Sequence, residues 1–481
     1  MQGAGDGRTF PEVTRPTSAG TGPIGDRGEV PPTAEDAHRA VDLSLRTGEL
    51  LLSGGASAAE VTETCAAVAR AGGLHRVECD ITFTSITVSG HLPGDPAPVS
   101  GLRLVRFREL DYSRVSAVHA LVTDLVEGRT TPVQADERLR SVAATRHPYG
   151  RVTVTVARAL LAAAVALLLG AGPEVTAAAF GATVLVDLAI DALGRRGIPA
   201  FFQNAVGGFI ATAVALGLVA ADVGVRPSLV VAGGIVLLLP GVTLVGAVHD
   251  AITGFYVTAS ARAFETFLLT AGIISGIAVA LSVGVRLGVP VRIWDPPATG
   301  LGDVPLQLLA AAVASAAFAV ANHAPRRTLV PAALAGATGW AVLLGVEHLD
   351  LSATLGSATA AVLIGMASYT LAVQQRVPAL VYVAAGIIPL LPGLTIYRAL
   401  RRLSEGDTLG GITLLGTAVT IGVALAAGAL FGEYLARALR RTASPVERRL
   451  TGLLRSRASR RAEPGATARP AAGGGPGRGF V

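Results

Sequence analysis

The sequence contains no lysine, only two cysteines, and few charged or aromatic residues. Charged residues account for 15% and aromatic residues for 5% of the 481 positions, whereas hydrophobic residues account for 51%. About a quarter of the residues in an average soluble domain are charged, so this chain lacks the polar surface that a soluble protein of its length needs. The composition therefore predicts a membrane protein.

The basic residues are all arginine, and they exceed the acidic residues to give a formal net charge of +6. They gather beside apolar segments and in the C-terminal tail, which follows the positive-inside rule and does not indicate a nucleic-acid partner. The two cysteines, Cys65 and Cys79, precede the apolar region, and we expect reduced thiols. Residues 1–33 contain no apolar core typical of a signal peptide, so we expect a cytoplasmic N-terminus.

Motifs for the common catalytic and cofactor chemistries are missing from the sequence. It contains no Walker loop, no dinucleotide-binding fingerprint, no cysteine and histidine spacing for a metal and no nucleophile elbow. We therefore expect neither an enzyme nor ATP-driven transport, and no cofactor or metal. Polar residues of the N-terminal part could supply a Ser/His/Asp hydrolase, but their spacing does not support one. They are His75, Asp80, Ser85, His91 and His119.

Shifts in composition divide the chain into five parts. Residues 1–33 and 443–481 are rich in glycine, proline, alanine and arginine, and we expect two disordered tails, the second of them basic. Residues 35–147 predict a small cytoplasmic α/β domain. Residues 152–287 and 304–441 each predict a membrane unit of five helices. The predicted fold class is thus a polytopic α-helical membrane protein preceded by a small soluble domain.

Local signals define the elements of the predicted soluble domain. One helix should end at residues 53–55 and the next should begin at Ser57, because Glu60 follows at the spacing of a capping box. Residues 77–88 are β-branched and alternate with a period of two, which predicts a single strand. A second strand and two more helices are expected at 102–107, 113–127 and 132–145.

The apolar part of the chain contains about ten segments of transmembrane length, each close to the roughly 20 residues that cross the hydrocarbon core. Glycine and alanine are abundant in all of them, which favours close packing of helices. Most arginines between the segments fall on the cytoplasmic side, but Arg398, Arg401 and Arg402 fall on the other, so the side of their loop stays open. The segments are expected at 154–171, 175–193, 200–221, 228–247, 264–286, 305–322, 328–346, 353–373, 378–397 and 409–433.

A motif of ten residues occurs twice. Residues 234–243 (GIVLLLPGVT) recur as residues 386–395 (GIIPLLPGLT), 152 positions further along the chain. Each copy lies in the fourth segment of its membrane unit, and because five is an odd number, the second unit should be inverted relative to the first. Inverted repeats with helices broken at matching positions are typical of secondary transporters, whose substrates bind near the breaks.

The centre of each motif is a Pro-Gly pair followed closely by a threonine. Proline has no amide donor and glycine permits unusual backbone angles, so each pair should break its helix and free backbone groups for a polar substrate. A kink filled by neighbouring helices is the alternative interpretation. The candidate substrate-binding residues at the breaks are Pro240, Gly241, Thr243, Pro392, Gly393 and Thr395.

Two aspartates lie four residues apart in the second predicted segment. Asp187 is deep within it, where an ionised carboxylate costs about 2.5 to 3.5 kcal/mol, so it is the first candidate for proton coupling. Asp191 is the second candidate, although an ion pair with Arg195 is an ordinary alternative. Gln203 and Asn204 could bind substrate or join helices by hydrogen bonds. His249, Asp250 and Glu265 could either form a proton path or anchor their helices at the membrane interface.

Several of these features occur together in a known family. The segments 52–61 (LSGGASAAEV) and 80–86 (DITFTSI) and the breaks at Pro240 and Pro392 make residues 35–440 resemble the threonine/serine exporter family. The resemblance implies a cytoplasmic N-terminal domain before ten membrane segments, and export of threonine and serine driven by the proton-motive force. It also implies a multi-pass protein of the cell membrane with both termini in the cytoplasm.

Two alternatives remain open at the level of sequence. The family also includes split, two-subunit relatives linked to succinate export, and a dicarboxylate exporter would use Arg398, Arg401 or Arg402 as anion partners. The other alternative is a membrane-anchored hydrolase or sensor that acts through residues 35–147. For a transporter we expect protons and a lipid bilayer as partners and no nucleic acid, and the sequence leaves open whether the chain forms a homo-oligomer.

Overall fold

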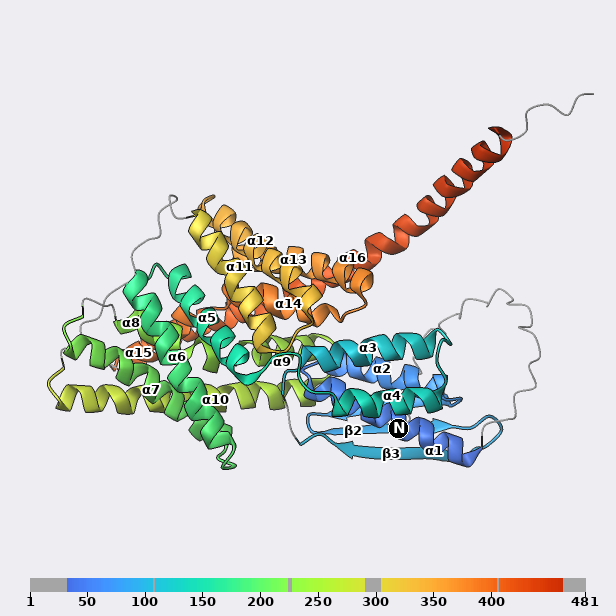
Figure 1. The fold of residues 1–481 in the computed structure, drawn as a ribbon, viewed down its shortest axis with the longest axis horizontal. Helices are drawn as coiled ribbons and strands as arrows, with labels where there is room; N and C mark the ends of the chain where they lie inside the picture. The colour runs from blue at the N-terminus through green and yellow to red at the C-terminus, as the bar shows by residue number, and fades with distance from the viewer. Residues whose placement is uncertain (1–32, 107–108, 224–226, 290–303, 405, 462–481) are drawn as a thin grey trace, which may run out of the picture.

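A computed structural model of the chain describes residues 33–106, 109–223, 227–289, 304–404 and 406–461. The N-terminal part, which we call the soluble domain, is a three-stranded antiparallel sheet in the order β1-β2-β3 with four helices (Figure 1). The predicted N-terminal tail lies outside the described residues, apart from Thr33. The elements are α1 (Ala34–Ser53), α2 (Ala58–Ala71), β1 (His75–Thr82), β2 (Ser85–His91), β3 (Pro98–Leu104), α3 (Tyr112–Val126) and α4 (Pro132–Ala144).

The first two helices form where the sequence predicts them, and capping side chains explain where they begin. Thr33 and Asp36 form a capping box at the start of α1. At the start of α2, the backbone N–H of Glu60 donates to the Ser57 hydroxyl at 3.2 Å. The apolar faces of both helices join the inner face of the sheet in one buried cluster. Burial of these faces therefore supplies most of their stability.

The prediction of a single strand at 77–88 is wrong, because this segment folds into a hairpin. Strands β1 and β2 pair with Thr82 opposite Ser85, and Phe83 in the turn has a positive φ of 23°. The turn contains no glycine, asparagine or proline, which are the usual signals of a hairpin. Its position is held from outside, since the Phe83 N–H donates to the Thr258 hydroxyl of a membrane helix at 3.1 Å. A tertiary contact thus decides the local structure.

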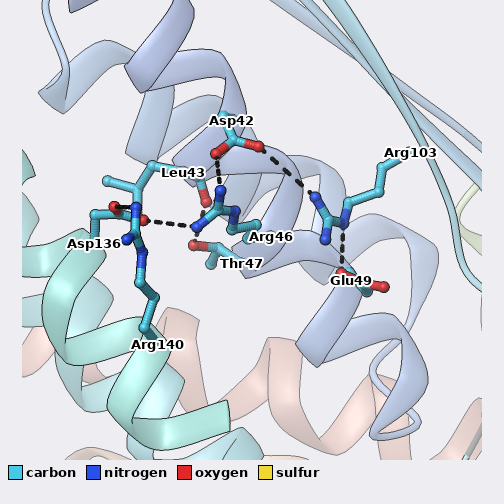
Figure 2. A network of polar contacts seen from close by, with 8 residues as sticks. All are labelled: Asp42, Leu43, Arg46, Thr47, Glu49, Arg103, Asp136 and Arg140. Atoms are coloured by element: carbon cyan, nitrogen blue, oxygen red, sulfur yellow. Dashed lines mark hydrogen bonds and ion pairs between the residues drawn. The ribbon is translucent and has the colours of Figure 1, made fainter. Parts of the chain in front are cut away.

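Ion pairs connect α1 to β3 and α4 on the soluble domain (Figure 2). Arg46 of α1 pairs with Asp42 of the same helix at 2.5 Å and with Asp136 of α4 at 3.2 Å. Arg103 of β3 pairs with Glu49 of α1 at 2.5 Å. All of these side chains are partly exposed, and exposed pairs contribute only about 0.2 to 1 kcal/mol each. They align the elements more than they stabilise the domain.

Ten helical stretches of the described chain correspond to the ten predicted segments. Eight are helices long and apolar enough to cross a membrane, and one more is a bent pair, Pro227–Leu238 and Gly241–Ile252, with an angle of 53° at the first break. The remaining stretch is a shorter apolar helix, Ala379–Leu390, followed by α15 after the second break. The elements are α5 (Arg151–Leu168), α6 (Pro173–Gly194), α7 (Ala200–Ala220), α8 (Pro227–Ile235), η1 (Val236–Leu238), α9 (Gly241–Ile252), α10 (Tyr256–Arg286), α11 (Val304–Ala321), η3 (Arg326–Thr328), α12 (Leu329–Glu347), α13 (Ala353–Gln375), α14 (Ala379–Ile387), η4 (Ile388–Leu390), α15 (Gly393–Ser404) and α16 (Thr408–Arg461).

The elements around each break repeat at a constant spacing. Helices α8 and α14, η1 and η4, α9 and α15, and α10 and α16 each begin 152 residues apart. Their packing repeats as well. A Cβ added to Gly276 of α10 would collide with the Ala205 carbonyl of α7, and one added to Gly428 of α16 would lie 2.7 Å from the Ala358 carbonyl of α13. The two halves are therefore built alike, around helix contacts that require glycine.

Helix α16 extends beyond its membrane portion, and Figure 1 shows its end leaving the body of the molecule. We expected a disordered tail at 443–481, but residues 443–461 continue the helix and the rest lie outside the described residues. Alanine, leucine and arginine are frequent in this stretch, and all three are good helix formers, which explains the difference.

Candidate functional site

The Pro-Gly breaks of the two halves lie in contact with each other. At each break the glycine N–H donates to a leucine carbonyl at 2.8 Å, Gly241 to Leu239 and Gly393 to Leu391, which is the bond of an inverse γ-turn around the proline. A Cβ on Gly241 would collide with the Leu391 side chain, and one on Gly393 would lie 3.2 Å from Leu239. The contact is reciprocal, as a two-fold relation between repeats would make it.

A cavity of about 380 Å³, which we call the inner cavity, lies beside this crossing. Its wall comes from both breaks, from α5, α11 and α12, and from residues 109–110 of the soluble domain. Much of the wall is apolar with a few polar positions, which is the usual character of a small-molecule site. The polar lining residues are Glu109, Arg158, Thr243, Asn322, His323 and Trp340.

Arg158 connects the inner cavity to the buried carboxylate of Asp187. The Arg158 guanidinium donates to Asp187 Oδ1 at 2.5 Å, and the Thr155 hydroxyl donates to Oδ2 at 2.5 Å. Thr155 and Arg158 are three residues apart on α5 and therefore share the face that meets α6. The Asp187 side chain is 6% exposed and that of Arg158 is 36% exposed. Arg158 thus lines the cavity, and Asp187 lies behind it.

The soluble domain meets the second half at one end of the inner cavity. The Tyr112 N–H donates to the Asn322 carbonyl at 2.9 Å, and the rings of His147 and His323 stack with centroids 4.4 Å apart. His147 Nδ1 lies 2.9 Å from Asp111 Oδ2. Burial lowers the pKa of His323, and the nearby His147 lowers it further. His323 is therefore neutral at pH 7 and able to hydrogen-bond without adding charge to the cavity.

A buried ion pair joins the soluble domain to the first half. Asp250 of α9 and Arg262 of α10, which we call the docking pair, lie 3.0 Å apart with side chains 0% and 6% exposed. The Ala58 N–H at the start of α2 donates to Asp250 Oδ1 at 2.9 Å, and Arg262 donates to the Ala56 carbonyl at 3.1 Å. The Asp250 carboxylate thus lies at the positive end of the α2 dipole, where a negative charge is stabilised.

The predicted substrate residues at the breaks have different surroundings. Pro240, Thr243 and Gly393 line the inner cavity, and Gly241 packs against the second break beside it. Pro392 and Thr395 are not among the described residues that line the cavity. Of the two threonines at the breaks, only Thr243 is therefore among the described residues that line the inner cavity.

The other predicted site residues lie away from the inner cavity. Gln203 Nε2 donates to the Ile198 carbonyl at 2.7 Å, and Asn204 Nδ2 donates to the Leu269 carbonyl of α10 at 3.2 Å. Asp191 is 38% exposed and forms ion pairs with Arg151 and Arg195. In this conformation the two amides join backbone segments, and Asp187 is the more enclosed of the two aspartates.

Sequence reasoning missed Arg158 and Thr155. The available signal was a single arginine inside the first apolar segment, with a threonine three positions before it. An ionisable residue inside a membrane segment is a functional candidate by default, so Arg158 could have been found in the same way as Asp187. Within the described part of the chain, no group of three or more His, Cys, Asp or Glu residues is placed to hold a metal ion.

Known proteins are similar to this chain in sequence. A family model described as "Putative threonine/serine exporter" matches residues 42–284, and one described as "Threonine/Serine exporter, ThrE" matches residues 307–435. The "Probable threonine/serine exporter" of Mycobacterium tuberculosis is 36% identical over 417 residues, which are 84% of this chain and 78% of that protein. The "Threonine/serine exporter" of Corynebacterium glutamicum is 35% identical over 408 residues, 83% of each chain. No solved structure matches. The chain belongs to the threonine/serine exporter family.

Proposed function

We propose that this protein exports threonine, serine and similar small amino acids across the cytoplasmic membrane, and that protons moving inward drive the export. The observation that carries the proposal is the Arg158–Asp187 pair at the wall of a cavity where two repeated helix breaks cross. The names of the two relatives supply the substrate class.

The pair suits the charges of an amino acid, which is a zwitterion at neutral pH. Arg158 offers a planar guanidinium that can bind a carboxylate through two parallel hydrogen bonds. Asp187 offers a carboxylate for the ammonium group. A substrate inserted between them would replace each bond of the pair with a bond to itself, so neither buried charge loses its partner. Thr243 and the carbonyls at the first break can bind the hydroxyl of threonine or serine.

The same pair gives the proton a role. A proton on Asp187 removes its negative charge, and with it the partner of the ammonium group, so the proton and the amino acid bind in alternation. Each then weakens the binding of the other. A transporter that carries either the proton or the amino acid in each crossing exchanges the two in opposite directions. Export of the amino acid driven by protons moving inward requires such an exchange.

The proposed topology places both termini and residues 35–147 in the cytoplasm, followed by inverted halves at 152–287 and 304–441. Under it the inner cavity meets the soluble domain on the cytoplasmic side, and access alternates as the halves rock about the crossing of the breaks. Arginines of the cytoplasmic loops support this orientation by the positive-inside rule. They include Arg195, Arg196, Arg326 and Arg327.

A dicarboxylate such as succinate suits the inner cavity less well than an amino acid. It needs two cationic partners, whereas Arg158 shares the lining with the carboxylate of Glu109. Burial lowers the pKa of His323, so this residue is neutral at pH 7. Arg398 and Arg402, which the sequence offered as anion partners, are not among the described lining residues.

Competition in inside-out membrane vesicles tests the substrate class. These vesicles expose the cytoplasmic face, so export appears as uptake of labelled threonine when respiration acidifies the interior. Excess unlabelled serine is expected to reduce this uptake to that of vesicles lacking the protein, because serine presents the same zwitterion and hydroxyl. Excess succinate should leave it unchanged. Inhibition by succinate and not by serine would assign the cavity to dicarboxylates.

A further inference from the structure

A second cavity, of about 560 Å³, lies between the soluble domain and the membrane helices. We call it the vestibule. Helices α2 and α3 form its soluble wall, and α9, α13, α14 and α16 contribute to its membrane wall. Val242 lines both the vestibule and the inner cavity, so the two cavities are neighbours at the first break. The volume is in the range of small-molecule sites.

Charged groups of both signs enter the vestibule from its two walls. Glu60 comes from α2, whereas Glu433 and Arg437, 3.7 Å apart, come from α16. The Arg437 guanidinium lies 5.4 Å from the ring centre of Tyr369 and 5.6 Å from that of Tyr434. Cation–π contacts of this length hold a guanidinium in place without using its N–H groups, so those that do not face Glu433 can bind an anion.

Two polar groups of the vestibule are left with unused bonding capacity. Among the described residues, the Glu60 carboxylate has no hydrogen-bond or ion-pair partner. Nδ1 of His249 is buried without a hydrogen bond. Burial raises the pKa of Glu60 to about 7, and the positive charge of Arg437 opposes the rise. A cation brought to this carboxylate would stabilise its charged form.

We propose that the vestibule binds the amino acid on its way from the cytoplasm to the inner cavity, with the ammonium group between Glu60 and Glu433 and the carboxylate on Arg437. This inference rests on the proposed function and adds a second binding site to it. Opposite charges facing one cavity meet both needs of a zwitterion, and the ammonium group relieves the repulsion between two partly buried carboxylates. Because Glu60 belongs to the soluble domain, that domain is part of the substrate path.

A proton on Glu60 competes with the ammonium group at the vestibule. The affinity of this site for threonine should therefore fall roughly tenfold for each pH unit well below the Glu60 pKa of about 7. In Glu60→Gln this dependence should become weaker, because only Glu433 remains as a carboxylate on which a proton competes with the ammonium group. The other titratable groups that face Glu60 are Glu63, His119, Glu127, His249 and Glu433, and Arg262 and Arg437 are the neighbouring cations.

Equilibrium binding of labelled threonine to the purified full-length protein tests this inference. The wild type is expected to bind two threonine molecules per chain at about pH 8. Glu60→Gln should weaken one site by roughly tenfold or more, since it removes one charge-assisted bond. Asp187→Asn should weaken the other site. Glu137→Gln, a matched change of an exposed glutamate on α4, should keep both sites.

The outcomes separate the vestibule from the proposed function. Two sites in the wild type with one lost in Glu60→Gln would support the vestibule. Unchanged stoichiometry and affinity in Glu60→Gln, while inside-out vesicles still transport threonine, would overturn the vestibule and leave the exporter standing. An absence of both threonine binding and threonine transport in the wild type would overturn both.

Discussion

Asp187→Asn is expected to reduce proton-driven threonine uptake by inside-out vesicles to the level of vesicles without the protein, whereas Asp191→Asn should keep most of the wild-type rate. Both substitutions remove one carboxylate from α6, four residues apart, and change the side-chain shape very little. The Asp187 side chain is 6% exposed and pairs with Arg158. The Asp191 side chain is 38% exposed and pairs with Arg151, at the start of α5, and with Arg195, just after the end of α6. Exposed pairs contribute about 0.2 to 1 kcal/mol, so Asp191→Asn should have a small effect.

A double variant separates folding from coupling. Asp187→Asn leaves Arg158 without its anion, and loss of one partner of a buried pair costs roughly 3 to 5 kcal/mol. The cost should be smaller here because the Arg158 side chain is 36% exposed. Asp187→Asn combined with Arg158→Gln removes both charges, so it should regain thermal stability without regaining transport. Transport by the double variant at the wild-type rate would exclude the pair from proton coupling.

Asp250→Asn is expected to release the soluble domain from the first half of the membrane part. The substitution removes the charge that pairs with Arg262, whose side chain is only 6% exposed, and weakens the acceptor of the Ala58 N–H. Loss of one partner of a buried pair costs roughly 3 to 5 kcal/mol, which corresponds to a hundredfold or more in the docking equilibrium. Amide hydrogen exchange at Ala58 should accelerate by about that factor.

Arg46→Gln is the matched control for the docking pair. It breaks ion pairs of Arg46 with Asp42 and Asp136 inside the soluble domain (Figure 2). These pairs have the same chemistry but are partly exposed, so exchange at Ala58 should stay at the wild-type rate. Slow exchange at Ala58 in Asp250→Asn would mean that other contacts hold the domain, and the docking pair would lose its assigned role.

The breaks and the segments around them could be predicted because their causes are local. Proline and glycine change the backbone at their own positions, so Pro240 and Pro392 show where a helix ends whatever surrounds it. The same holds for the cap at Ser57, whose partner is three residues away. Long apolar runs likewise predict helices of membrane length from composition alone.

The features that could not be predicted depend on partners distant in sequence. The hairpin turn at Phe83 is held by Thr258, and the N–H of Ala58 in the first turn of α2 bonds to Asp250, 192 residues away. Nothing in the local pattern of either segment indicates such a partner. Arg158 and Asp187 were each visible as charges in apolar segments, but their pairing follows from the packing of α5 on α6.

The amide residues show a second limit of sequence reasoning. Gln203 and Asn204 have the groups that a substrate site needs, and the same groups also bond to backbone carbonyls. Residue type does not choose between these roles. Position in the fold does, and it turns both amides toward the carbonyls of Ile198 and Leu269.

Threonine uptake by respiring inside-out vesicles that contain the wild-type protein, measured with and without a protonophore, tests the central claim most directly. Proton-driven export predicts accumulation of labelled threonine above that of vesicles without the protein, and its collapse when the protonophore is added. Uptake equal to that of vesicles without the protein, or uptake that the protonophore leaves unchanged, would contradict the claim.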